Sequence, residues 1–148
     1  MISYDDFKKV EIRAGKILSA DKIPDTDKLL KLMVDFAEKK ERKNTSAQDV
    51  SGITSVVDGT VDGTIEMVAA PRQIISGISK YFPDPAVLVG KTCMFVTNLE
   101  PRMIKGFESN GMLFAVSTPE GAGVNGNSGG GFSLLEPNGS IPPGTLAA

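Results

Sequence analysis

Residues 98–112, NLEPRMIKGFESNGM, carry several groups that could contact a nucleotide. Arg102 and Lys105 are long cations that can reach phosphate oxygens from a loop. Ser109 offers a small hydroxyl for a phosphate or a ribose 2′-OH, and Met112 offers a soft apolar surface for a base or a ribose. The segment is too polar for a buried strand and too rich in Gly and Pro for a helix, so we expect a loop. The chemistry that this predicts is noncovalent binding.

These residues also have ordinary structural explanations. Two cations in a loop are often simply solvated. Asn98 could bind a base edge or a ribose, but an Asn at a strand exit also caps turns through its own backbone. Met112 could contact a ligand, or it could begin the next strand and pack in the core. For Asn98 and Met112 both explanations stay open at the level of sequence.

The chain contains no histidine and a single cysteine, Cys93. Histidine is the usual acid–base group near neutral pH and the commonest metal ligand. Its absence excludes zinc sites and nucleophilic sites of the Ser/His or Cys/His type. No glycine-rich phosphate-binding motif occurs, and no pair of carboxylates suggests catalysis. We therefore expect a binding module with no catalytic residues, no metal site and no cofactor.

The formal net charge of −2 is unevenly distributed along the chain. Residues 72–110 contain five cations and three acidic residues, a net charge of +2. Residues 41–71 contain two cations and five acidic residues, a net charge of −3. A nucleic-acid-binding protein usually has a basic excess, so binding of a polyanion would have to depend on the middle of this chain.

The single cysteine cannot form an internal disulfide, which favours a reducing compartment. No apolar run approaches the length of a membrane span, and the N-terminal residues MISYDDFKKV do not resemble a signal peptide. We therefore expect a cytoplasmic protein that has no membrane partner.

Period-two patterning predicts a chain made mainly of strands. Leu30, Leu32, Val34 and Phe36 alternate with more polar residues, so they should share a buried face. Gly15 interrupts the first pattern and predicts a bulge or a bend there. The expected strands are 10–20, 29–36, 72–77, 91–98 and 111–118, followed by a last strand at 132–137, with a short helix after Ser3 and helical turns at 78–82 and 84–90.

Five principal strands, a bend at a glycine in the first, and a helical piece between the third and fourth describe a five-stranded OB-fold Greek-key barrel. An SH3-like barrel or a small sandwich would fit the strand count nearly as well, and the helical piece favours the OB-fold. The length of 148 residues suits a single domain, 1–148.

Two segments depart from a minimal barrel. Residues 38–71 contain VDGT twice, at 57–60 and 61–64, and Asp-Gly between β-formers predicts a hairpin turn. We expect an inserted β-hairpin with either Asp-Gly at its tip. The hairpin could be a partner-binding arm or an extension of an RNA-binding surface. Its acidity argues against phosphate contact, so the preferred interpretation is a tolerated surface insertion. Residues 121–131, GAGVNGNSGGG, predict a glycine-rich loop.

Several stretches together resemble the tRNA-binding domain family. The matching pieces are DFKKVEIRAGKI, DKLLKLMVDF, RQIISGISKYF, LVGKTCMFVTNLEPRMIKGFESNGM and LLEPNGSIPPGT. The family includes the C-terminal appendage of methionyl-tRNA synthetase and stand-alone tRNA-binding proteins. The resemblance implies an OB-fold that binds structured tRNA by shape and phosphate contacts, aids an aminoacyl-tRNA synthetase or acts on its own, and often forms a homodimer through its terminal segments.

The resemblance and the residue types together give nine candidate RNA-binding residues. These are Lys28, Lys31, Arg72, Ser76, Asn98, Arg102, Lys105, Ser109 and Met112. A low aromatic content of 6% makes a reader of single strands by base stacking a poorer fit than recognition of folded RNA. The alternative is a protein-binding or chaperone-like module on the same fold that does not bind RNA. A related secretion-chaperone branch has that function but lacks the NLEPR motif.

Overall fold

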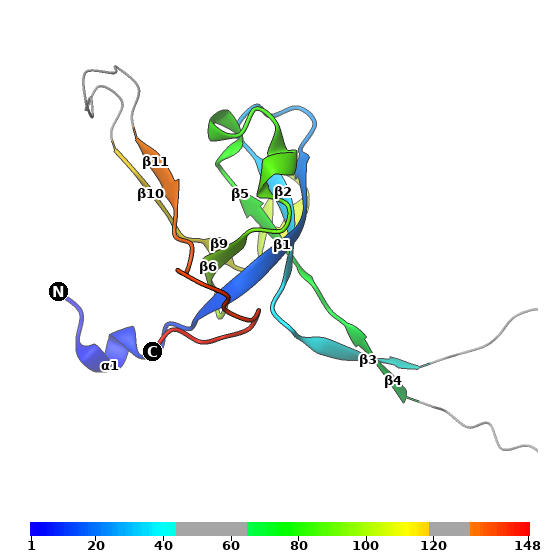
Figure 1. Ribbon diagram of the computed structural model, residues 1–148, viewed down its shortest axis with the longest axis vertical. Coiled ribbons are helices and arrows are strands. Elements are labelled where there is room, and N and C mark those ends of the chain that lie inside the picture. Colours follow the sequence, from blue (N-terminus) through cyan, green and yellow to red (C-terminus); the bar gives the residue numbers. More distant parts are fainter. Residues whose placement is uncertain (44–64, 119–130) are drawn as a thin grey trace, which may run out of the picture.

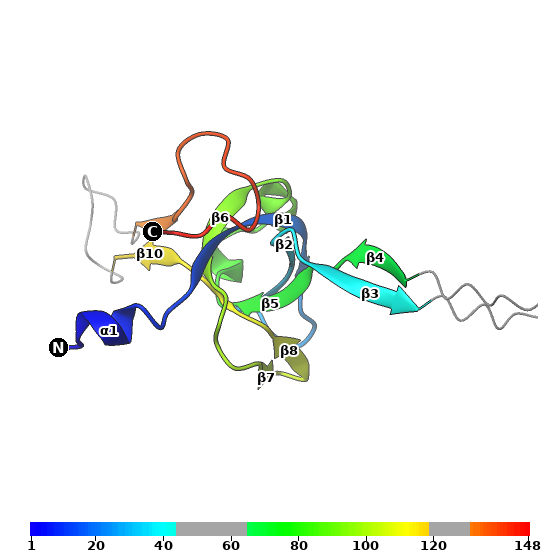
Figure 2. The ribbon, with the colours of Figure 1, turned by 90° about the horizontal axis from the view of Figure 1, so that it is seen from below.

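The computed structural model describes residues 1–43, 65–118 and 131–148. Its centre is a strongly curved antiparallel sheet that nearly closes into a barrel (Figures 1 and 2). The strand order is β5 (Arg72–Ser76), β2 (Leu30–Asp35), β1 (Ile12–Lys22), β6 (Thr92–Val96) and β9 (Met112–Leu113). This sheet confirms the predicted mainly β architecture and is consistent with an OB-like fold. Within the described residues, no helix has the length and apolar character needed to cross a membrane.

Two hydrogen bonds join the ends of the curved sheet. The Asn110 amide donates to the Gln73 carbonyl at 2.8 Å, and the Ile75 amide donates to the Ser109 hydroxyl at 3.0 Å. Both contacts join β5 to the chain just before β9. The sheet therefore closes through the segment around Ser109.

The barrel interior is filled by the residues that the alternation in β2 predicted. Leu30, Leu32 and Val34 are fully buried and Phe36 is 2% exposed. Phe36 meets Phe95 edge-to-face, with ring centroids 5.4 Å apart, which is a favourable aromatic arrangement. Each large buried side chain contributes roughly 1.5–3 kcal/mol, so this core holds the strands that position the rim.

The bulge predicted at Gly15 is wrong. The register of β1 against β2 shifts between Ile17 and Ser19 instead. Gly15 pairs regularly with Cys93, and a Cβ there would lie 2.5 Å from a ring carbon of Phe36. The close approach of Phe36 therefore requires glycine at this position.

The loop predicted for residues 98–112 is also wrong, because it contains a small hairpin. Strands β7 (Arg102–Ile104) and β8 (Phe107–Ser109) pair antiparallel. The turn consists of Lys105 and Gly106, which have positive φ values of 51° and 82°. Two successive positive φ values are typical of the tight turn that suits the twist of a hairpin. The two strands are short and lie exposed on the barrel surface, so their polar composition did not predict them.

Two further hairpins extend from the barrel. The insertion begins as an arm of β3 (Lys39–Lys43) and β4 (Ile65–Ala69), which projects away from the barrel (Figure 1). Both predicted Asp-Gly turns lie outside the described residues. The strand predicted at 111–118 is divided into β9 and β10 (Ala115–Ser117), and β10 pairs with β11 (Phe132–Leu134). The predicted glycine-rich loop lies outside the described residues except for Gly131.

The helical segments are short. Helix α1 (Tyr4–Phe7) begins after Ser3, whose hydroxyl accepts a hydrogen bond from the Asp6 amide, as the sequence predicted. Two 3-10 turns, η1 (Ser79–Tyr81) and η2 (Pro85–Leu88), lie between β5 and β6. The C-terminal tail runs beside β1, where the Ala147 amide donates to the Ile12 carbonyl at 2.8 Å.

Candidate nucleic-acid interface

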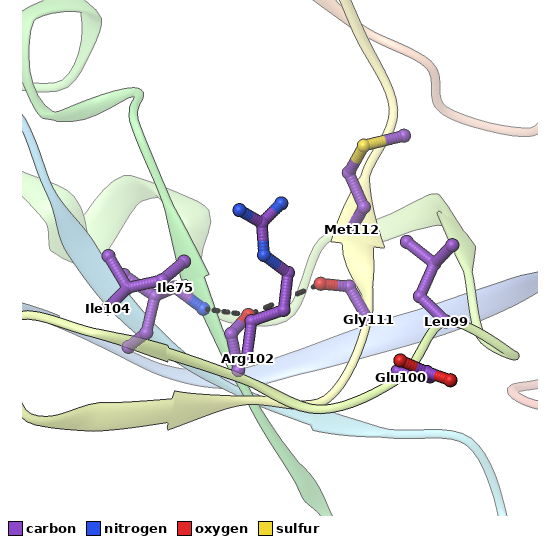
Figure 3. A pocket seen from close by; sticks show the side chains of 8 residues that line it. Ile75, Leu99, Glu100, Arg102, Ile104, Gly111 and Met112 are labelled. Carbon is purple, nitrogen blue, oxygen red and sulfur yellow. Dashed lines mark hydrogen bonds between the residues drawn. The ribbon is translucent and has the colours of Figure 1, made fainter.

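A pocket of about 120 Å³ lies between the β7–β8 hairpin and the barrel, and we call it the rim pocket. Figure 3 shows the Arg102 side chain between two isoleucines on one side and Met112 on the other. Its lining residues are Ile75, Leu99, Glu100, Arg102, Ile104, Ser109, Gly111 and Met112. Three of the nine candidates thus meet at one site. Five lining residues were not among the candidates. Leu99, Glu100, Ile104 and Gly111 were indicated only by their place within residues 98–112, and Ile75 lies far from that segment in the sequence.

Arg102 and Lys105 are exposed on the hairpin beside this pocket. Arg102 begins β7, and Lys105 occupies the turn. Neither side chain has an ion pair or a hydrogen bond to another described side chain. Their charges are therefore available to an external anion.

Ser109 lies beneath the rim pocket and is only 4% exposed. Its hydroxyl accepts from the Ile75 amide at 3.0 Å and donates to the Gly111 carbonyl at 3.3 Å. The hydroxyl thus both accepts and donates a hydrogen bond inside the protein, and Figure 3 draws these two bonds as dashed lines that end at Ile75 and Gly111. The direct RNA contact predicted for Ser109 stays a prediction, and the observed bonds give it a supporting role in holding β8 against β5.

Met112 begins β9, and its side chain is 48% exposed on the wall of the rim pocket. Its neighbour Leu113 turns inward and is 8% exposed. Of the two explanations that the sequence left open for Met112, this exposure favours contact with a ligand over packing in the core.

Asn98 connects the exit of β6 to the chain before β1. Its side-chain oxygen accepts from the Glu11 amide at 2.8 Å, and its side-chain nitrogen donates to the Lys9 carbonyl at 2.6 Å. This cross-link differs from a local turn cap, and it occupies the groups that would read a base edge. A role of Asn98 in RNA binding stays a prediction.

Arg72 is engaged by neighbouring groups at the start of β5. Its guanidinium forms a two-pronged ion pair with Glu38 and donates to the Thr97 carbonyl, and it lies over the ring of Phe36 at 5.4 Å. The hydrogen bonds from Arg72 lower the pKa of Glu38, and the same bonds raise the pKa of Arg72. Contact with a phosphate would have to compete with these partners.

The remaining candidates lie along β2 and β5. The Lys31 ammonium is 5.9 Å from the centre of the Phe107 ring, and Lys31 pairs in register with Ile75 of the rim pocket. Lys31 therefore belongs to the neighbourhood of the hairpin. Lys28 is exposed and Ser76 is half-buried at the other end of this strand pair, where Ser76 faces Leu30.

No group of three or more His, Cys, Asp or Glu side chains that could hold a metal ion occurs in residues 1–43, 65–118 and 131–148. Cys93 is fully buried, and its burial raises the pKa of the thiol to about 11. A thiol with so high a pKa is a poor nucleophile near neutral pH. What this surface offers is cations and an apolar patch.

Comparison with known proteins finds similarity to a tRNA-binding domain family and to methionine–tRNA ligases. Residues 59–146 match a family model described as "Putative tRNA binding domain". The methionine–tRNA ligase of Methanoregula boonei is 38% identical over 145 residues, which are 98% of this chain and 15% of the relative. The ligase of Enterococcus faecalis is 32% identical over 120 residues, 81% of this chain and 14% of the relative. The chain thus spans about one-seventh of the length of these relatives.

Solved structures show the same architecture. A methionyl-tRNA synthetase (MetRS) related protein from Pyrococcus horikoshii aligns with a TM-score of 0.68 at 27% identity, covering 100% of this chain and 98% of that protein. The CsaA chaperone protein from Picrophilus torridus aligns with a TM-score of 0.63 at 23% identity, covering both chains fully, and at that identity it shows the fold alone. Together with the family match over more than half of the sequence, these findings establish that the chain belongs to the tRNA-binding domain family.

Proposed function

We propose that this chain is a non-catalytic, cytoplasmic module that binds structured tRNA by shape and phosphate contacts. It would aid an aminoacyl-tRNA synthetase of the methionyl type or act as a free-standing tRNA-binding protein. The observation that carries the proposal is the pair of uncompensated cations, Arg102 and Lys105, on a fixed hairpin beside the exposed Met112. The family match supports tRNA as the RNA.

The hairpin is held in place before any ligand arrives. The side-chain amide of Gln73 donates to the Glu108 carbonyl at 2.8 Å, and the Ser109 hydroxyl fixes the end of β8. Arg102 and Lys105 therefore project from a preformed platform, which lowers the ordering cost of binding. In this arrangement the cations contact phosphates and Met112 contacts a base or a ribose.

The aromatic residues support recognition by shape rather than by stacking. Phe95 is fully buried. Tyr81 and Phe132 stack on each other, with centroids 4.0 Å apart. Single-strand binders instead present aromatic faces to successive bases. Folded RNA is contacted mainly at phosphates and 2′-hydroxyls, which suits the cations and the apolar patch of the rim pocket.

The proposed site also includes the other candidates, which we expect to contribute unequally to RNA binding. These are Lys28, Lys31, Arg72, Ser76 and Asn98. Lys31 lies near the hairpin through Phe107 and is the best placed of them for direct contact. Arg72 and Asn98 already have protein partners, so we assign them to positioning. Lys28 and Ser76 would contact RNA only if it extends along β2 and β5.

A homodimer is part of the proposal, because terminal segments form the dimer in the resembling family. Tyr4 and Phe7 of α1 are 72% and 53% exposed. They line a cavity of about 380 Å³ together with the C-terminal Ala147 and Ala148. Burial of such side chains favours association. Measuring the mass in solution of the wild type and of Phe7→Asp tests this, and a wild type that stays monomeric at micromolar concentration would overturn it.

The RNA site is tested by titrating total tRNA into the wild type and into a variant with Arg102→Gln and Lys105→Asn. Asn is chosen because it tolerates positive φ, so the turn is preserved. We expect the variant to lose affinity roughly 10-fold or more at low salt and to show a shallower salt dependence.

The matched control is Lys8→Gln with Lys9→Gln, which removes two exposed cations from the chain at α1. If the wild type does not bind tRNA at low salt, RNA binding is excluded and the protein-binding, chaperone-like alternative takes its place. If the wild type binds and the hairpin variant matches the control, the assignment of the site is wrong.

A further inference from the structure

The charge on the inserted arm is segregated between its two strands. Strand β3, KKERK, contains four cations and one acidic residue. Strand β4, IEMVA, contains one acidic residue and no cation. Residues 44–64 of the sequence contain three acidic residues and no cation. The net acidity of the insertion therefore lies outside the paired strands, whose own net charge is +2.

The cations nearest the barrel have no acidic residue opposite them. In the register of the arm, Lys39 faces Ala69 and Lys40 faces Val68, and both lysines are exposed. Arg42, two pairs further out than Lys40, faces Glu66. Directly opposed side chains in an antiparallel pair share one face. Successive residues of a strand point to opposite faces, so the base of the arm presents one lysine on each face, and neither has an acidic cross-strand partner.

Protection of a sheet edge does not account for this arrangement by itself. Lysines on an edge strand discourage pairing with other chains, and β3 and β4 are both edges of the two-stranded sheet. The β4 edge has no such protection, since Ile65 and Met67 are 55% and 52% exposed. Edge protection would require charges on both strands, so it does not explain why the cations are confined to β3.

The base of the arm is attached to the strand that also supports the rim hairpin. Arg72, the first residue of β5, holds Glu38 just before β3. The next residue, Gln73, bonds the Glu108 carbonyl in β8. The arm and the hairpin are thus both attached to the first two residues of β5, and Figure 2 shows both projecting from the barrel.

We propose that β3 is a second phosphate-contact surface, in which Lys39 and Lys40, with a smaller part for Arg42, bind the backbone of the RNA that occupies the rim pocket. This inference rests on the proposed function. It extends the RNA-binding surface to a segment that was interpreted from the sequence as a tolerated insertion. A molecule as large as a folded RNA can reach both surfaces at once, and phosphate contacts of this kind fix its orientation without reading its sequence.

The test compares two adjacent lysine pairs in the full chain. Lys39→Gln with Lys40→Gln removes the arm cations. Lys8→Gln with Lys9→Gln removes two exposed lysines that directly follow α1, at the other end of the molecule (Figure 1), and of these Lys9 is ion-paired with Asp6. We expect the arm variant to bind tRNA roughly 2- to 10-fold more weakly at low salt. The negative slope of the logarithm of the binding constant against the logarithm of the salt concentration should become shallower by about one to two. The control variant should match the wild type.

Arg42→Gln is a third variant, and its effect should be smaller because Glu66 lies opposite Arg42. If the hairpin variant with Arg102→Gln and Lys105→Asn loses affinity while the arm variant behaves like the control, the inference about the arm fails and the proposed function stands. If the wild type does not bind tRNA at all, the proposed function fails first. A loss of affinity in the arm variant without a change in salt slope would also overturn the inference, because phosphate contacts must change that slope.

Discussion

Arg72 and Glu38 form an ion pair that joins the two points where the chain leaves the barrel for the arm and returns from it. Glu38 directly precedes β3, and Arg72 is the first residue of β5. The Ala70 amide adds a bond to the Glu38 carbonyl at 2.9 Å. An arm held this way has a defined direction at its base, and so the position of Lys39 and Lys40 depends on Arg72.

A double-mutant cycle that combines Arg72→Gln with the pair Lys39→Gln and Lys40→Gln distinguishes a positioning role of Arg72 from direct contact with RNA. If Arg72 acts by holding the arm, Arg72→Gln should weaken tRNA binding in the wild type but have little further effect once the arm lysines are absent. If Arg72 binds phosphate itself, the two effects should add, as they do for independent sites. Binding isotherms of the four proteins at one salt concentration provide the measurement, and additive losses would contradict the positioning role.

The same ion pair should make stability depend on pH. The pKa of Glu38 is lowered in the folded state from its ordinary value of 4.5, so the folded state favours the charged carboxylate. The stabilisation is therefore complete above pH 4.5 and is lost as the pH falls through the lowered folded value. At neutral pH we expect Glu38→Gln to reduce the free energy of unfolding by roughly 1–2 kcal/mol.

Urea denaturation of the wild type and of Glu38→Gln between pH 7 and pH 3 measures this difference. The gap between the two proteins should be constant down to about pH 5 and then shrink. The pKa of Glu11 is also lowered, mainly by its hydrogen bond from Thr97, so the wild type should lose further stability in the same range. A gap that grows on acidification would show that Glu38 is not stabilised as an anion.

Gly15 provides a prediction about the core. A Cβ at this position would lie 2.5 Å from the Phe36 ring and 2.6 Å from a methyl carbon of Val34, both in the packed interior. Gly15→Ala should therefore destabilise the protein by about 1–3 kcal/mol. Gly77→Ala is the matched control, because a Cβ there meets nothing within 4 Å. Thermal unfolding of both variants decides the matter, and equal melting temperatures would refute the steric explanation.

These cases also show what the sequence could and could not predict. The alternation of Leu30, Leu32, Val34 and Phe36 directly reflects one buried face, so the core of β2 was predictable. A glycine within a strand pattern marks either a bulge or a close approach, and only the position of Phe36 across the barrel distinguishes the two. The sequence of one strand does not contain that information.

The candidate site was predictable to a similar extent. Apart from Ile75, the residues that line the rim pocket lie within residues 98–112, so Arg102, Ser109 and Met112 were identified together. The partners of Arg72 lie 25 and 34 residues away in the chain, and those of Asn98 lie 87 and 89 residues away. Residue types alone do not reveal such pairings. The charges of the arm were misjudged because net charge was counted over residues 41–71, which omits Lys39 and Lys40 and does not resolve which strand carries which sign.

Substitutions of Ser109 and Met112, both at the rim pocket, should affect protein stability and tRNA affinity differently. Ser109→Ala removes the acceptor of the buried Ile75 amide, and an unsatisfied buried donor costs about 1–3 kcal/mol. We expect this variant to unfold at lower urea concentration and, where it is folded, to bind tRNA less tightly because β8 is released. Met112→Ala removes a side chain that is 48% exposed, so its stability should change little while its tRNA affinity falls severalfold.

The two measurements are urea denaturation and tRNA titration on the same protein preparations. Because β8 carries the hairpin that presents Arg102 and Lys105, loss of its attachment should affect binding through the position of these cations. Ser109→Thr keeps the hydroxyl and should recover part of the stability, to the extent that the buried site accommodates the added methyl group. If Ser109→Ala is as stable as the wild type and still loses affinity, Ser109 contacts RNA directly and its assignment as a support is wrong. If Met112→Ala loses stability and not affinity, Met112 belongs to the core.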